Sequence, residues 1–202
     1  MTAYLSLYRL EISAGETARW PDGVGAALIH SGDTSVQGEA VFIERSTPLV
    51  TAQTDAVLLC FMLSRTKGQG PTCLESRAID VVAPFLFRLD EVAFPPGAQA
   101  YRHVHPGPGF RHLRWGVLHL VADDHSFDAH PGDTWFEAAH SPVRATATED
   151  ADETRFVRCM ILPVACEGKP TITILDPQDA DRPKRQTTHR HVDRILDQVD
   201  AG

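Results

Sequence analysis

The sequence predicts an all-β protein made of many short antiparallel strands. Fourteen Gly and fourteen Pro divide the 202 residues into short segments, and residues of these two kinds are typical of turns. Apolar runs of strand length recur between the turns, as they do in a β-sandwich or barrel. The expected strands, in chain order, cover residues 4–12, 25–30, 40–44, 56–63, 85–94, 111–121, 134–137, 143–148, 155–162 and 171–175.

The end of the chain has a different period. Val192, Ile195, Leu196 and Val199 recur at the spacing that places side chains on one face of a helix. The pattern predicts a short C-terminal helix. We expect the His-Arg-His run just before it to be solvated or to cap that helix.

Charge and composition limit the classes of molecule that this protein is expected to bind. Lys and Arg number 19 against 27 Asp and Glu, and the net charge of −8 argues against nucleic acid or an anionic membrane as the main partner. No apolar run reaches the roughly 18 residues of a membrane span, and the N-terminus lacks the basic and apolar regions of an export signal. The four cysteines form no Cys-x-x-Cys pair. We therefore expect a cytoplasmic protein without a nucleic-acid or membrane partner.

An internal repeat organises most of the chain. Residues 38–48 align without a gap on 132–142, and residues 56–63 align on 155–162 with Cys60 opposite Cys159. Gly32 and Gly116 also correspond, so order and spacing are both kept, as expected after a duplication. The predicted division is an N-terminal half at 1–63, a connection at 64–84, a C-terminal barrel at 85–163, and a tail at 164–202 that packs across a barrel and carries the short helix.

Histidine is the most informative residue type. Seven of the ten histidines lie between His103 and His140. On a strand, His103 and His105 point to the same face because side chains alternate. Two imidazoles on one face of a barrel can bind one divalent ion.

The stretch around this pair resembles the cupin superfamily. Gly97, His103, His105 and Gly116 fall in register with the family's first motif, and Pro131-Gly-Asp133 opens its second. The resemblance implies a double-stranded β-helix, or jelly roll, with two cupin-like barrels in one chain. It also implies that the N-terminal copy has lost its motif histidines and that the protein is a homodimer.

At two of the family's metal-ligand positions, this sequence has a residue that cannot bind a metal ion. Gly109 stands where a Glu is expected, and Val143 stands where the third His is expected. His140 or His112 could complete a metal site with His103 and His105. Some thiol and diketone dioxygenases of the family use three histidines without the Glu. The alternative is a metal-free pocket in which the two histidines form hydrogen bonds or act as general bases.

The resemblance therefore implies a small-molecule protein, and leaves open whether it is an enzyme. One expectation is Fe, Mn, Ni or Zn in the C-terminal barrel, with dioxygenase-like or Lewis-acid chemistry on a small organic acid, keto compound or thiol. Tyr101 and Arg111 would then orient the substrate, unless Arg111 forms a salt bridge with Asp133 or Glu137. The other expectation is a metal-free binding or regulatory protein without catalysis.

Overall fold

The computed structural model describes residues 1–199 and divides the chain into two compact units. The first unit contains Met1–Phe87 together with residues 194–199, and the second contains Arg88–Asp193. The all-β prediction is confirmed, because strands make up every regular element of residues 1–199 except two short 3-10 helices, η1 (Val164–Cys166) and η2 (Pro177–Asp179). No helix in this part of the chain is long and apolar enough to cross a membrane.

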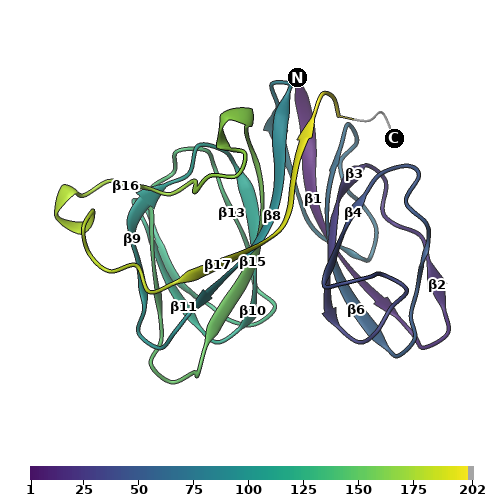
Figure 1. Cartoon of the computed structure of the whole chain (residues 1–202), viewed down its shortest axis with the longest axis horizontal. Coiled ribbons are helices and arrows are strands. Elements are labelled where there is room, and N and C mark those ends of the chain that lie inside the picture. The colour runs from purple at the N-terminus through teal and green to yellow at the C-terminus, as the bar shows by residue number, and fades with distance from the viewer. Residues whose placement is uncertain (200–202) are drawn as a thin grey trace. The chain divides into compact units, whose positions relative to one another are not determined.

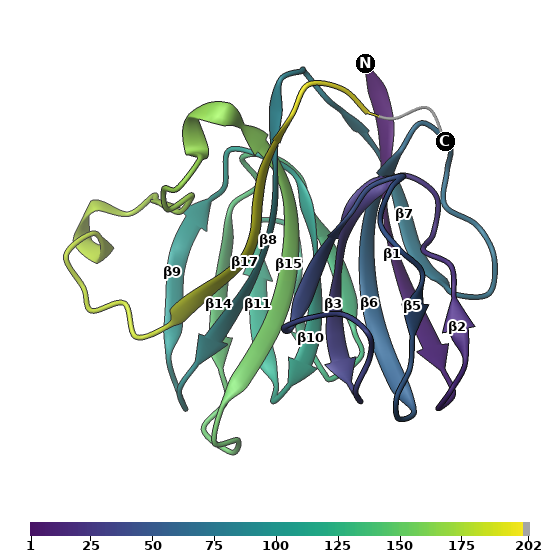
Figure 2. The ribbon, with the colours of Figure 1, turned by 45° about the vertical axis from the view of Figure 1, so that its right-hand side comes forward.

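The first unit is built on one large antiparallel sheet. Its strand order is β4-β3-β6-β1-β7, and a separate two-stranded sheet pairs β2 with β5. Figure 2 shows β1, β3, β6 and β7 running side by side. The bounds are β1 (Thr2–Ile12), β2 (Thr17–Ala18), β3 (Val24–Ser31), β4 (Ala40–Ile43), β5 (Val50–Thr51), β6 (Ala56–Ser64) and β7 (Cys73–Asp80).

Both faces of this large sheet carry buried apolar side chains, and one of its faces holds a compact core cluster. Leu58, Cys60 and Met62 alternate along β6 and are buried with Val50 and Ala52 from the smaller layer. Burial raises the pKa of the Cys60 thiol, so this cysteine packs as an apolar residue. The second layer of this unit is therefore reduced to two short strands and loops.

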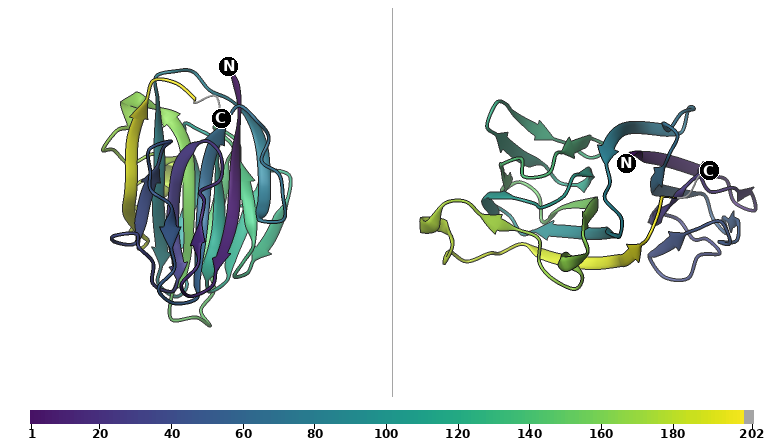
Figure 3. Two further views of the ribbon diagram at one scale, coloured as in Figure 1. Left: turned by 90° about the vertical axis from the view of Figure 1, so that its right-hand side faces the viewer. Right: turned by 90° about the horizontal axis from the view of Figure 1, so that it is seen from above.

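The second unit contains two five-stranded sheets that pack face to face. Their orders are β13-β10-β15-β8-β17 and β12-β11-β14-β9-β16. Figure 1 labels every strand of the former sheet and β9, β11 and β16 of the latter, and the right-hand view of Figure 3 looks down on this unit from above. This is the predicted double-stranded β-helix. The bounds are β8 (Phe85–Phe94), β9 (Gln99–Val104), β10 (Gly109–Trp115), β11 (Leu118–Ala122), β12 (Ser126–Ala129), β13 (Thr134–Glu137), β14 (Val143–Ala147), β15 (Thr154–Pro163), β16 (Thr173–Ile174) and β17 (Thr187–Leu196).

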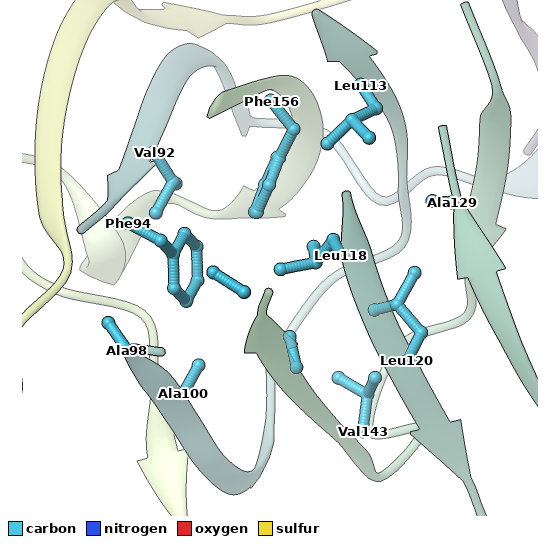
Figure 4. Close-up of a cluster of buried hydrophobic side chains, with 12 residues drawn as sticks. Val92, Phe94, Ala98, Ala100, Leu113, Leu118, Leu120, Ala129, Val143 and Phe156 are labelled. Carbon is cyan, nitrogen blue, oxygen red and sulfur yellow. The ribbon is translucent and has the colours of Figure 1, made fainter. Parts of the chain in front are cut away.

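An apolar cluster fills the space between these two sheets (Figure 4). Phe94 and Phe156 come from one sheet, and Leu118 and Val143 come from the other. The rings of Phe94 and Phe156 have centroids 6.0 Å apart, within the range of favourable aromatic pairs. The cluster fixes the separation of the sheets and forms the floor of the site described below.

The repeated segments occupy equivalent places in the two large sheets. The order β4-β3-β6-β1 in the first unit corresponds to β13-β10-β15-β8 in the second. Gly32 follows β3 with a φ of +79°, and Gly116 follows β10 with a φ of +75°. A Cβ at these positions would overlap the backbone of Ala56 and Thr154 respectively. Both turns therefore require glycine for conformation and for space.

The predicted C-terminal helix is wrong. Residues 187–196 form β17, which lies beside β8 at the edge of a sheet. The four apolar residues have helical spacing, but the same segment contains Thr187, Thr188, Val192 and Ile195, which are β-branched. The free edge of β8 offers backbone partners that a helix could not use, and tertiary pairing of this kind overrides a short periodic pattern.

The predicted segment boundaries also differ from the observed units. Residues 64–84, expected as a connection, contain β7, which pairs with β1 from Thr2↔Asp80 to Leu7↔Glu75. The strand expected at 111–121 is divided into β10 and β11 around Gly116. The tail after Pro163 contributes β16 and β17, so it completes both sheets of the second unit.

A buried arginine holds the tail in place. Arg88 on β8 is 1% exposed, and its Nε and Nη2 donate to the Asp193 carboxylate at 2.8 and 3.0 Å. Its Nη1 and Nη2 also donate to the carbonyl oxygens of Lys169 and Cys166, both at 2.8 Å. Because these bonds use most of the guanidinium donors, the buried charge is well compensated.

We predict that Arg88→Gln lowers the free energy of unfolding by about 3–5 kcal/mol, because it removes the buried cation that donates twice to Asp193 and leaves that carboxylate only the longer contact with Arg190. Urea denaturation of the full chain measures this change. The control is Arg102→Gln, whose ion pair with Asp123 is exposed and should cost about 0–1 kcal/mol. Equal stability of the two variants would contradict the assigned role of Arg88.

Candidate functional site

A cavity of about 240 Å³ lies inside the barrel of the second unit. Its apolar side is made by members of the cluster in Figure 4, among them Phe94, Leu120 and Phe156, together with Trp135. The remaining wall is polar and carries most of the charge. The polar and charged residues of the wall are Arg88, Asp90, His103, His105, Arg111, Glu137, Arg158, Thr171, Lys184, Gln186, Thr188 and Arg190.

The two motif histidines face this cavity together. His103 lies on β9 and His105 follows the strand, and each is 5% exposed. Their ring centroids are 4.9 Å apart and the rings are nearly perpendicular, at 83°. The sequence argument that both rings share one internal face therefore agrees with the geometry.

A β-bulge in β9 decides which neighbours join them. Opposite β14, Val143 pairs with His103 but Ala145 pairs with Ala100, so three steps on β9 match two on β14. Ala100 and His103 consequently both line the cavity. Tyr101, expected to share the face of His103, is not part of the lining, and its ring lies 5.6 Å from the Arg182 guanidinium. The bulge breaks the simple alternation on which that expectation rested.

Hydrogen bonds define the protonation of both imidazoles. His103 Nδ1 lies 2.6 Å from the carbonyl oxygen of Tyr101, and His105 Nδ1 lies 3.1 Å from that of Thr171. A carbonyl oxygen only accepts, so Nδ1 carries the proton and Nε2 carries a lone pair in each ring. Burial lowers the pKa of His103. Burial, followed by the nearby Arg158 and Arg111 charges, lowers the pKa of His105 further, so both rings are neutral at pH 7.

Two guanidinium groups lie beside the histidines. Arg158 donates to both oxygens of the fully buried Asp90, at 2.6 and 3.1 Å, and its Nη1 lies 3.3 Å from Nε2 of His105. Arg111 is 1% exposed and places Nη2 2.8 Å from Glu137 Oε2. Arg111 therefore lines the cavity and forms the salt bridge with Glu137, which was the alternative to a substrate-orienting role.

The two candidate third ligands lie outside the cavity wall. His140 has a φ of +59° in the turn after β13, where its backbone N–H donates to the His105 carbonyl oxygen at 2.8 Å, and its side chain is exposed. His112 follows the inward-facing Arg111 on β10, so it points to the other face of the sheet, and its Nδ1 lies 2.8 Å from Thr134 Oγ1. The structure brings neither imidazole to His103 and His105.

The residues around the histidine pair do not fit a bound divalent metal. In the described chain, no set of three His, Cys, Asp or Glu donor atoms within 4.8 Å of one another includes His103 or His105. The Glu of the family motif cannot stand at Gly109, because a Cβ there would overlap the carbonyl oxygen of Cys159. Nε2 of His105 already receives a donor from Arg158. Catalytic metal sites usually need three protein ligands with free donor atoms.

Several cavity residues were not identified from the sequence. Asp90, Arg158, Lys184, Gln186 and Arg190 all line the wall. The first two carried a usable signal, since charged residues inside strongly apolar strands are seldom buried without a partner. The other three lie in the tail between the last expected strand, 171–175, and the predicted helix, where the sequence analysis predicted no strand.

We predict that the histidine pair makes the fold less stable in mild acid. Each imidazole has an ordinary pKa near 6.5, and the folded pKa is lower, so the unfolded chain binds more protons below pH 6.5. The free energy of unfolding then falls by roughly 1.4 kcal/mol per pH unit for each imidazole that stays neutral. In urea denaturation between pH 7 and pH 5, His103→Gln/His105→Gln should lose less stability than the native chain.

The control for this measurement is His125→Gln/His130→Gln, which removes two exposed imidazoles from the same unit. It should follow the native chain over the whole pH range. The explanation fails if the two double variants have the same pH dependence.

Comparison with known proteins gives matches only among solved structures. No family model matches the chain, and no curated protein matches it. An RmlC-like cupin from Shewanella frigidimarina NCIMB 400 is 19% identical over 37% of this chain and 65% of its own length, with a TM-score of 0.34. The polyketide cyclase RemF from Streptomyces resistomycificus is 21% identical over 46% and 63%, with a TM-score of 0.37.

A cupin 2 conserved barrel domain protein from Leptotrichia buccalis is 13% identical over 79% of this chain and 84% of its own length, with a TM-score of 0.45. The chain thus spans just under two thirds of the length of the Shewanella and Streptomyces proteins. The order of the strands in the two sheets and the inward-facing His-x-His motif have been established independently above. The strand order by itself gives the second unit a double-stranded β-helix fold.

Proposed function

We propose that the second unit binds a small organic acid inside its barrel, and that protein side chains hold this ligand without a metal ion on His103 and His105. The charge of the cavity wall carries the proposal. Five cationic side chains line it against two carboxylates, Asp90 and Glu137, while the two histidines are neutral. Asp193, which pairs with Arg88, compensates one more charge, so the wall keeps an excess of positive charge.

An excess of positive charge on the cavity wall favours an anionic ligand. Opposite charges attract more strongly beside a protein interior than in bulk water, because the surrounding medium is less polar. Arginine in particular matches the planar, two-oxygen geometry of a carboxylate. A carboxylic acid is therefore the class of ligand that this wall recognises best.

The size and the apolar wall limit the rest of the ligand. The volume of about 240 Å³ lies below the roughly 300–1,000 Å³ of pockets for drug-sized molecules. The rings of Phe94, Trp135 and Phe156 form a continuous aromatic surface, with centroids 5.6 Å apart for Trp135 and Phe156. A compact aromatic or branched aliphatic body fits this surface.

His103 supplies a further recognition group. Its Nδ1–H is used by the Tyr101 carbonyl, which leaves the Nε2 lone pair available at the cavity wall. A neutral imidazole nitrogen accepts a hydrogen bond from a ligand hydroxyl or N–H group, and can take up a proton from it. The preferred ligand is therefore an acid that also carries such a donor.

We predict that the protein binds benzoate but not benzamide, which has the same shape without the charge. At least one hydroxybenzoate isomer should bind more tightly than benzoate, and His103→Ala should remove that advantage, about three- to tenfold. Isothermal titration calorimetry measures each affinity. The control His130→Ala changes an exposed imidazole and should leave all affinities unchanged. Equal binding of benzoate and benzamide would refute recognition of the acid.

We also predict that the histidine pair carries no metal ion in solution. Protein purified without an affinity tag or added metal should contain far less than one equivalent of Fe, Mn, Ni or Zn by elemental analysis. His103→Ala/His105→Ala should leave that content unchanged, and EDTA should leave benzoate binding unchanged. One equivalent of metal that disappears in the double variant would restore the metal-dependent alternative.

A further inference from the structure

We infer that the carboxylate of the ligand binds to Lys184 and Arg190 in the C-terminal segment, and not to the arginines beside the histidines. This inference rests on the proposed function and adds the position of the acid and the residues that select it. The segment 184–190 is outside both family motifs.

The arginines of the inner wall already have partners for their charge. Arg158 forms a two-fold pair with Asp90, and Arg88 forms one with Asp193. Arg111 holds Glu137 at 2.8 Å, although its Nη2 makes no well-directed hydrogen bond. A ligand carboxylate at any of these groups would have to compete with a protein carboxylate.

The tail segment carries the charge that is not compensated. Lys184 forms no ion pair with any residue of the described chain. Arg190 Nη1 lies 3.6 Å from Asp193 Oδ2, an oxygen that already accepts from Arg88 and from the backbone N–H of Gly168. The excess charge of the cavity therefore lies on Lys184 and Arg190.

Two buried polar atoms in the same segment lack hydrogen-bond partners. Within residues 1–199, Arg190 Nε and Gln186 Oε1 are both buried without a partner. A buried donor without an acceptor has lost its hydrogen bond to water without a replacement, which is more unfavourable when the group is charged, so such atoms call for an explanation. A carboxylate would accept from Arg190 Nε. The Gln186 amide can turn by 180° and donate to the same carboxylate.

The period of the segment brings these groups to one face. Residues 184, 186, 188 and 190 all line the cavity, whereas 185, 187 and 189 do not. This is the alternation of an extended strand, so the side chains of residues 184, 186, 188 and 190 lie on the face of the segment that borders the cavity. Arg185 shares their charge and neighbourhood but faces away, which makes it a matched control.

The test compares Lys184→Gln, Arg190→Gln and Arg185→Gln, which each remove one positive charge from the same segment. Benzoate and benzamide are titrated into the full chain by calorimetry, and circular dichroism with thermal melting checks each fold. Lys184→Gln and Arg190→Gln should each weaken benzoate binding about tenfold, as expected for a charged hydrogen bond. Arg185→Gln should change it less than twofold. If Arg190→Gln does not fold, the exposed Lys184 decides the question alone.

The outcomes separate this inference from the proposed function. If the native chain binds benzoate, and Lys184→Gln and Arg190→Gln bind it as tightly as Arg185→Gln does, the inference is overturned and the proposed function stands. The inference is also overturned if all three variants lose affinity equally, because that result reflects only the net charge. If the native chain discriminates no carboxylate from its amide, the proposed function fails and the inference fails with it.

Discussion

The buried ion pair between Arg158 and Asp90 is the constraint on which the site depends. Asp90 is fully buried on β8 and Arg158 comes from the adjacent β15, so the pair spans two neighbouring strands. An unpaired charge at either position would be strongly destabilising, and the pair therefore fixes the guanidinium where it meets His105. Burial first, and then the charge of Arg158, keep the imidazole neutral. The same contact gives its Nε2 a donor in the place where a metal ligand would need a free lone pair.

The distribution of charge on the polar wall of the cavity follows from the Arg158–Asp90 pair and its contact with His105. Along the polar wall, the histidines are neutral and the charges of Arg111 and Arg158 are balanced by Glu137 and Asp90. The positive charge that is not balanced lies in the C-terminal segment. The opposite wall is the apolar cluster of Figure 4. These two walls are the basis for proposing a ligand with one charged end and one apolar end, and the fold itself does not choose between binding and catalysis.

The two units show how one strand order supports different interiors. The sheet β4-β3-β6-β1 of the first unit and the sheet β13-β10-β15-β8 of the second have the same strand order. The glycines after β3 and β10 have the same conformation for the same steric reason. The first unit pairs its large sheet with only β2 and β5, and its core is filled by side chains such as Leu58 and Met62. The second unit has a complete second sheet, and that sheet supplies the strand with the histidines.

The sequence by itself determined the all-β class, most strand positions, the repeat and the inward-facing pair His103 and His105. These features depend on local chemistry: two-residue alternation, glycine turns and the spacing of a short motif. Only the tertiary structure decided that Tyr101 turns away at a bulge, that His140 and His112 stay apart from the pair, and that the tail is β17. Each of these outcomes depends on a neighbouring strand that is distant in the chain, and no local pattern records which edge a segment will pair with or which charge it will meet there.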